Sequence, residues 1–284
     1  MRKSSSIHAM LPPFLGNAWI ALGFSLFFLS CDLETPRALE TNLLIEAEEL
    51  VRIERTLVES TFLGVLPWET YSETSWPPLP GCPSIQMLGD TLALTFISPR
   101  EEGPEGCERL LNRGGNLRIV RGEREGRPLT RIEYDNYLVR AVQVNGVREF
   151  ILQENGIFEE NSPAPIRLTY PSGSSARISI QAQHELAEDE TGAPLLRSTV
   201  TRSGQNQTGR SLLMSSTRPT ERLRSCWEQD RISMRVGETS ARIGRAAGME
   251  VRHTVTFGQE LACTSFADVT LEDGRLVRIN FTED

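Results

Sequence analysis

The sequence predicts a mainly β protein, an antiparallel sheet system with one N-terminal helix. Two observations predict this class. From residue 84 onward, short runs rich in β-branched and aromatic residues alternate between apolar and polar positions and are separated by turn-forming residues. Before residue 67, one segment repeats its apolar residues with helical spacing. The pattern indicates about ten strands and leaves open whether they form an open sheet, a sandwich or a barrel.

Composition narrows the class of protein further. With 284 residues, 39% of them hydrophobic and 24% charged, the chain is neither wholly disordered, nor collagen-like, nor a polytopic membrane protein. A formal net charge of −8 argues against nucleic acid as a partner. Apart from Arg2 and Lys3, every basic residue is an arginine, which excludes Schiff-base lysine chemistry in a chain that has lost its leader.

The N-terminus has the layout of an export signal. Arg2 and Lys3 form a short positive region, residues 19–29 are apolar, and the small residue Ser30 precedes Cys31. This arrangement resembles the lipobox of bacterial lipoproteins, in which the cysteine thiol receives a diacylglycerol and becomes the new N-terminus.

That resemblance implies a signal peptide over residues 1–30, lipidation at Cys31 and a polar tether over residues 31–38. Acyl chains on Cys31 would hold the protein at a membrane without a spanning helix. We therefore expect a lipid-anchored protein of the cell envelope, at the outer membrane, with the side of the membrane left open. An uncleaved helical anchor and plain secretion are the alternatives.

Residues 39–66 are predicted to hold one amphipathic helix, with Thr41 or Asn42 as its cap. Glutamates cover much of the surface that the apolar stripe leaves. We expect the helix to pack on the sheet of its own chain, although leucines at seven-residue spacing would also suit a partner helix. The stripe consists of Leu43, Leu44, Ala47, Leu50, Val51, Glu54, Leu57 and Val58.

Residues 67–83 are rich in proline, which predicts an irregular, extended linker. The linker carries three aromatic residues, Trp68, Tyr71 and Trp76. We expect them to cover an edge of the core; contact with a ligand is the alternative.

The cysteines after Cys31 support an oxidising compartment. An even number of cysteines in an exported chain predicts disulfides, and four cysteines allow three connectivities. Zinc is the rival interpretation, but no two cysteines have CxxC spacing, so we expect neither a metal nor a cofactor. If neighbouring cysteines in the sequence pair, one disulfide would cross-link each of two related β-units within residues 84–284. Those pairs would be Cys82 with Cys107 and Cys226 with Cys263.

Two hairpins are predicted from turn chemistry. Asn145-Gly146 is a strong two-residue turn signal between Val144 and Val147. At the C-terminus, a three-residue loop, Glu272-Asp273-Gly274, would place Val269 opposite Val277 and Ala267 opposite Ile279, with Asp268 facing Arg278. A loop one residue shorter would separate the apolar side chains onto opposite faces, so burial selects the three-residue loop.

Several short motifs together resemble a group of uncharacterised lipoproteins of the Bacteroidota type. The resemblance covers nearly the whole chain after the leader, and it implies no known activity. It rests on the Cys31 leader, the acidic helix, Gly81-Cys82-Pro83, Gly106-Cys107, Tyr134-Asp135-Asn136-Tyr137, Asn145-Gly146, Cys226-Trp227 and the segment from Phe257 to Cys263.

The search for catalytic chemistry finds no GxSxG elbow, HExxH helix, glycine-rich phosphate loop or CxxC redox pair. A serine hydrolase would need His184 or His253 as its base. The acidic residues beside His184 (Glu185, Glu188 and Asp189) predict a solvated turn instead. The pairs Glu101-Glu102 and Glu159-Glu160 are interpreted as surface charge.

The sequence therefore predicts an exported, lipid-anchored envelope protein that is not an enzyme and has a binding or structural role. Its expected partners are the membrane, through the lipid on Cys31, and a protein, a glycan or an apolar ligand. The alternative is a hydrolase that acts on polymers of the envelope or the cell surface.

Overall fold

The computed structural model describes residues 36–71, 79–96, 111–229, 231, 234–245, 248–258, 263 and 266–280, with side chains from residue 43 onward. The mainly β class is confirmed: one antiparallel sheet of fourteen strands accompanies an N-terminal helix. This is more strands than the roughly ten that the sequence indicates. Residues 43–284 form one unit of the chain, which contains the whole sheet.

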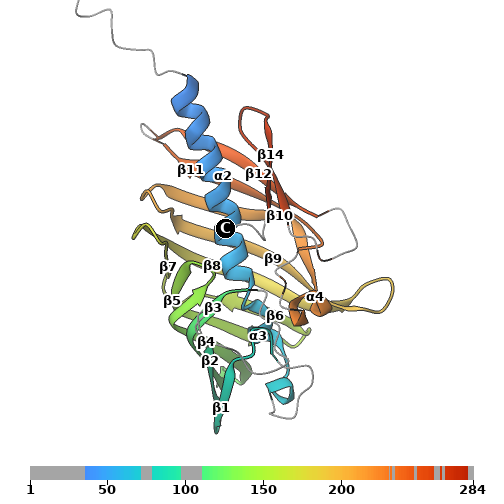
Figure 1. The fold of residues 1–284 in the computed structure, drawn as a ribbon. Helices are drawn as coiled ribbons and strands as arrows, with labels where there is room; N and C mark the ends of the chain where they lie inside the picture. Colours follow the sequence, from blue (N-terminus) through green and yellow to red (C-terminus); the bar gives the residue numbers. More distant parts are fainter. Residues whose placement is uncertain are drawn as a thin grey trace, which may run out of the picture. The chain divides into compact units, whose positions relative to one another are not determined.

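The strands follow one another as hairpins, so neighbours in sequence are mostly neighbours in the sheet (Figure 1). The exception is the place where β6 and β7 both lie between β5 and β8. The strands are β1 (Ser84–Leu88), β2 (Thr91–Phe96), β3 (Arg113–Arg124), β4 (Arg127–Val139), β5 (Val142–Leu152), β6 (Ile157–Asn161), β7 (Ile166–Thr169), β8 (Ser175–Glu188), β9 (Pro194–Gln205), β10 (Ser211–Leu223), β11 (Val236–Gly244), β12 (Glu250–Phe257), β13 (Phe266–Thr270) and β14 (Leu276–Asn280).

Helix α2 spans Pro36–Val58, so it begins within the predicted tether and ends before residue 66. A short helix α3, Thr61–Val65, follows it. Side chains of the sheet stabilise the end of α2. Arg148 donates to the carbonyl oxygen of Leu57 at 2.7 Å, and Arg222 donates to that of Val58. Two cations therefore satisfy carbonyl groups that the last turn of a helix leaves unpaired.

Helix α2 lies across the strands on one face of the sheet (Figure 1). The inward side chains of the strands are apolar at almost every second position, as in β8 with Ala176, Ile178, Ile180 and Ala182. These side chains and the helix form one core. The expectation that the helix packs on its own sheet is therefore confirmed.

The register of the final hairpin is as predicted. Val269 pairs with Val277 and Ala267 with Ile279, while Arg278 donates to both carboxylate oxygens of Asp268 at 2.8 and 2.9 Å. Gly274 takes the left-handed conformation, with φ of +85°, that closes this loop.

The predicted hairpin at Asn145-Gly146 is wrong. Both residues lie inside β5, and the turn between β4 and β5 consists of Arg140 and Ala141. The reason is a bulge in β4, where Asn136 takes a positive φ of +54° and the register shifts. The side chain of Asn145 accepts a hydrogen bond from the backbone N–H of Asn136 at 3.0 Å. Asn145-Gly146 thus accommodates a bulge in the neighbouring strand.

Two of the three linker aromatics cover the core. Trp68 and Tyr71 lie in a 3-10 helix, η1 (Trp68–Tyr71), and their rings meet edge to face at 5.7 Å. Tyr71 is buried, and its hydroxyl donates to the carbonyl oxygen of Leu63 at 2.6 Å. Trp76 lies outside the described residues.

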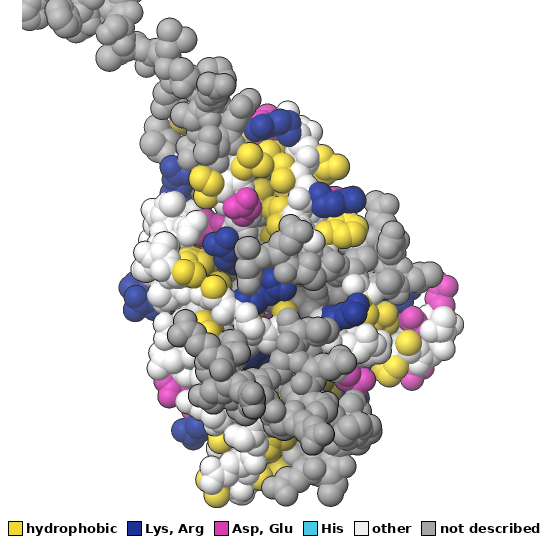
Figure 2. Space-filling model, in the orientation of Figure 1, with side chains coloured by type: hydrophobic (Ala, Val, Ile, Leu, Met, Phe, Trp, Pro, Cys, Tyr) yellow, Lys and Arg dark blue, Asp and Glu magenta, His cyan; other side chains and the backbone are white. Residues whose placement is uncertain are grey.

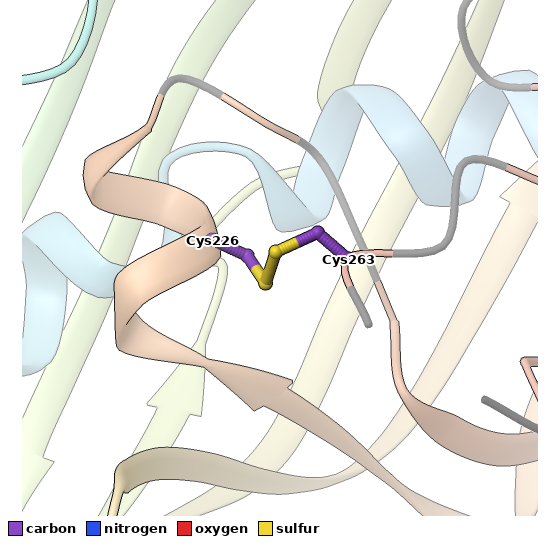
Figure 3. Close-up of a disulfide and its surroundings, with 2 residues drawn as sticks. All are labelled: Cys226 and Cys263. Carbon is purple, nitrogen blue, oxygen red and sulfur yellow. A yellow bond between two sulfur atoms is a disulfide. The ribbon is translucent and has the colours of Figure 1, made fainter. Parts of the chain in front are cut away.

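A disulfide joins Cys226 to Cys263, with the two Cα atoms 5.6 Å apart (Figure 3). Cys226 belongs to a short helix, α4 (Arg224–Glu228), and Cys263 lies in the connection before β13. The bond is one of the two pairs of sequence neighbours. Cys107, the neighbour of Cys82, lies outside the described residues, as does Cys31.

Candidate functional site

Four glutamates of the α2–α3 segment are buried against the sheet. Glu46, Glu49, Glu54 and Glu59 are each 4% exposed or less, whereas Glu48 is exposed. An amphipathic helix would turn all its glutamates to solvent. These four turn toward strands instead, because the sheet presents charged partners at inward positions.

The partners of Glu46 and Glu49 include residues of the turn between β9 and β10, whereas those of Glu54 and Glu59 lie on β9 and β3. Glu49 has neutral partners: its carboxylate accepts hydrogen bonds from the side-chain amide of Asn206 at 3.1 Å and from the backbone N–H of Gln207 at 2.6 Å. The other three glutamates form ion pairs with arginines. The ion pairs are Glu46 with Arg210 at 2.9 Å and with Arg245, Glu54 with Arg202 at 2.6 Å, and Glu59 with Arg113 at 2.7 Å.

Burial shifts the pKa of two of these carboxyl groups. It raises the pKa of Glu54, and the charges of Arg202 and Arg222 only partly oppose it. It raises the pKa of Glu49 as well, against hydrogen bonds from Gln207 and Asn206. Buried ion pairs of this kind are costly to break, because the remaining partner is left as an unpaired charge.

A second polar cluster lies below the junction of α2 and α3. Arg148 on β5 donates from Nε and Nη2 to the two carboxylate oxygens of Glu160 on β6, at 2.6 and 2.8 Å. His184 on β8 places Nε2 2.7 Å from Glu160 and Nδ1 2.8 Å from the hydroxyl of Ser198 on β9. All four side chains are buried.

The protonation states in this cluster follow from its contacts. Burial by itself would raise the pKa of Glu160, but the charge of Arg148 and the hydrogen bonds from His184 and Arg148 outweigh it and lower that pKa. Burial lowers the pKa of His184, although Glu160 opposes the shift. Neutral His184 then donates from Nε2 to Glu160 and accepts from Ser198 at Nδ1.

Arg222 lies near the same cluster. Burial, together with the positive charges of Arg148 and Arg202, lowers its pKa to about 9. The negative charges of Glu59 and Glu160 oppose this shift, and the carbonyl oxygen of Val58 accepts a hydrogen bond from the Arg222 guanidinium.

Two predictions for these residues are wrong. His184 is buried in a strand and does not lie in a solvated turn, because it continues the inward alternation of Ile180 and Ala182. Glu160 is not surface charge, whereas Glu159 is exposed. Glu185 pairs with Arg197 on the outer face, and Asp189 bonds within the turn after β8. Glu101-Glu102 lies outside the described residues.

The order Ser198, His184, Glu160 is that of a hydrolytic triad, yet its setting differs from one. The hydroxyl meets Nδ1 and the carboxylate meets Nε2, and Arg148 holds the same carboxylate with two hydrogen bonds. A nucleophile must also reach its substrate, and Ser198 is 3% exposed. His253 is likewise buried, with Nε2 3.4 Å from Glu46.

A cavity of about 530 Å³ is lined by residues of α2, of β14 and of the turn between β4 and β5. Its apolar wall comes from Val51 of the helix, Val142 of β5, and Val277 and Ile279 of β14. Its polar groups come mainly from the helix, with Glu48, Arg52 and Arg55; Arg278, Asn280, Ala141 and Pro171 complete the described lining.

A second cavity, of about 490 Å³, shares Ala141 and Pro171 with the first. Phe96, Leu138 and Tyr170 give it apolar surface, and Asn136 and Gln143 give it polar groups. Each volume lies in the range of about 300–1,000 Å³ that is typical of ligand pockets. The sequence did not indicate these residues as a site, because strands far apart along the chain build it.

The outer surface shows no single charged face in the view of Figure 2: arginines are distributed among acidic and apolar side chains. No helix within the described part of the chain is long and apolar enough to cross a membrane. Among the same residues, no cluster of three His, Cys, Asp or Glu side chains is arranged to hold a metal ion.

Comparisons of the chain with models of protein families, with curated proteins and with solved structures found no match. The candidate site therefore rests on geometry alone: one cavity beside α2, a second that shares Ala141 and Pro171 with it, and a buried polar network on the inner face of the sheet.

Proposed function

We propose that the chain is an exported, lipid-anchored protein of the cell envelope that binds an apolar or amphiphilic small molecule without converting it chemically. The observation that carries the binding role is the pair of cavities that share Ala141 and Pro171 in their linings. Both combine apolar walls with a few polar groups, as small-molecule sites do.

Two features support the location. The leader that ends at Ser30-Cys31 supports export and lipidation. The disulfide between Cys226 and Cys263 supports an oxidising compartment, where such bonds persist.

Binding is tested on the full chain in its own membranes with a photoreactive long-chain alcohol. Peptide mapping should find the label within residues 141–148 and 168–177, the segments that contain lining residues of both cavities. Ala141→Trp should block the label, because Ala141 is exposed in a turn and lines both cavities. Glu154→Trp, in the exposed turn at the other end of β5, is the matched control and should label like the wild type. Equal labelling of all three proteins would overturn the binding role.

Lipidation is tested by growing cells with labelled palmitate. The wild type should incorporate the label and Cys31→Ser should not, with Cys82→Ser as the control for a cysteine elsewhere in the chain. Palmitate on the Cys31→Ser protein, or none on the wild type, would refute the anchor.

A hydrolase is the second candidate because Ser198, His184 and Glu160 form one hydrogen-bonded chain, although the hydroxyl meets Nδ1 and Ser198 is 3% exposed. A fluorophosphonate probe on the full chain distinguishes the two. A hydrolase would be labelled in the wild type and in Ser203→Ala, an exposed neighbour on β9, but not in Ser198→Ala. The binding role predicts no label on Ser198.

A further inference from the structure

Arg222 on β10 is a cation, 5% exposed, for which the described residues supply no carboxylate at ion-pair distance. Its guanidinium donates to the carbonyl oxygen of Val58, and its Cζ lies over the Phe62 ring, 4.8 Å from the centroid. A buried charge without an ionic partner is costly, so a fold that keeps one calls for an explanation. The glutamates around it are each paired with another arginine: Glu59 with Arg113, Glu160 with Arg148 and Glu54 with Arg202.

Arg222 lines a small third cavity, which shares no lining residue with the two larger ones. Its volume of about 10 Å³ is roughly the space that one water molecule requires. Phe62 of α3 and Trp227 of α4 give it apolar walls, with their ring centroids 5.2 Å apart. Arg231 also lines the cavity and is exposed, so the cavity borders the surface of the protein.

We propose that this third cavity binds a small inorganic anion such as chloride, with Arg222 as its main ligand and Arg231 as a second positive charge. The anion would accept a charge-assisted hydrogen bond from the Arg222 guanidinium, which the described residues leave without a carboxylate. The volume admits a monatomic ion and excludes a larger organic acid. The site goes beyond the proposed binding function, because its residues belong to neither of the larger cavities.

Glu59 and Arg113 line the same cavity, but the carboxylate of Glu59 is already engaged. Its Oε1 accepts from Nε of Arg113 at 2.7 Å, and its Oε2 accepts from the hydroxyl of Tyr137 at 2.8 Å. The pKa of Arg222 supports the same interpretation, since burial and the charges of two other arginines lower it to about 9. The guanidinium therefore stays charged at neutral pH in surroundings that favour an added negative charge.

Trp227 reports on the site, because bromide quenches the fluorescence of a tryptophan that it contacts. Bromide should replace gluconate at constant ionic strength in a solution of the full chain. We expect part of the fluorescence to fall with a saturable dependence on bromide, and chloride should restore it. Trp227→Phe should lose this saturable component. Trp68→Phe is the matched control and should keep it, because Trp68 lies beside a different arginine, Arg121, at 4.8 Å.

The arginines are tested in the same way. Arg222→Met should abolish the saturable component, and Arg218→Met, an exposed arginine on the same strand, should leave it unchanged. Arg231→Gln keeps the experiment decisive if Arg222→Met does not fold, because it removes an exposed side chain. Half saturation in Arg231→Gln should need about threefold more bromide than in the wild type.

Three results would overturn the anion site. The first is quenching of the wild type that rises linearly with bromide. The second is a saturable component that chloride does not reverse. The third is half saturation in Arg231→Gln at the same bromide concentration as in the wild type.

Discussion

Arg148 and Glu160 form a two-pronged ion pair across β5 and β6, with N–O distances of 2.6 and 2.8 Å and both side chains 2% exposed or less. Arg148 also donates to the carbonyl oxygen of Leu57 and to the hydroxyls of Ser60 and Thr61. One guanidinium thereby links two strands to the C-terminal end of α2. The pair lies at the point where the helix ends and α3 begins.

Replacing Arg148 should therefore destabilise the fold strongly. Arg148→Met leaves Glu160 as a buried carboxylate without its main partner, and we expect the free energy of unfolding to fall by about 3–5 kcal/mol. Arg118→Met removes an arginine from an exposed pair with Glu133 and should cost about 0.5 kcal/mol or less. Urea denaturation monitored by circular dichroism measures both losses. Similar losses of unfolding free energy in the two variants would show that the buried pair stabilises the fold no more than the exposed pair does.

Stability should decrease as the pH falls, partly through His184. Its folded-state pKa lies below the ordinary value of 6.5, so just below that pH the unfolded chain binds a proton that the folded chain does not. His184→Asn should flatten the dependence of unfolding free energy on pH, by up to about 1.4 kcal/mol per pH unit. Urea titrations between about pH 7 and about pH 5.5 test this, with the exposed neighbour Gln183→Ala as the control. A slope in His184→Asn equal to that of the wild type would contradict the prediction.

Gly146 should not tolerate a side chain. Its φ is +139°, and an added Cβ would lie 2.8 Å from Cδ1 of Ile166 and 3.2 Å from its Cα. Gly126 has a positive φ of +73° in the turn between β3 and β4, but open space surrounds the position of its Cβ. Gly146→Ala should lower the free energy of unfolding by about 1–3 kcal/mol more than Gly126→Ala does. If Asn145-Gly146 were an exposed hairpin turn, the two losses measured by denaturation would be alike.

The disulfide should contribute measurably to stability. It joins residues 37 apart in sequence, and a closed loop of that length restricts the unfolded chain enough to stabilise the folded state by about 3–4 kcal/mol. Removing both sulfurs with Cys226→Ala and Cys263→Ala should lower the free energy of unfolding by this amount. Because the double variant lacks this bond, a reducing agent should change its stability little. A double variant as stable as the wild type would argue against the bond in the native protein.

Features that depend on local alternation could be predicted from the sequence. The register of the last hairpin is one, because placing Val269 and Val277 on one buried face permits a single loop length. His184 shows where the same reasoning could have gone further. It occupies the inward phase of β8 after Ile180 and Ala182, and a polar residue in that phase signals a buried partner.

The identity of such partners could not be predicted in that way. Glu54 and Arg202 are 148 positions apart in sequence, and only the path of α2 across the strands brings them together. The predicted hairpin turn at Asn145-Gly146 is wrong for a related reason. Its turn propensity is local, but the bulge at Asn136 in the neighbouring strand determines its conformation.

The mainly β class, the N-terminal helix and the pairing of the last two strands follow from the sequence alone, because hydrophobic periodicity and turn chemistry act over a few residues. The packing of distant segments decides that the helix buries its glutamates, that Arg148 meets Glu160, and that residues of α2, β5 and β14 line one cavity. Burial and charge pairing between distant segments depend on how the whole sheet packs against the helix, and no local pattern contains that information.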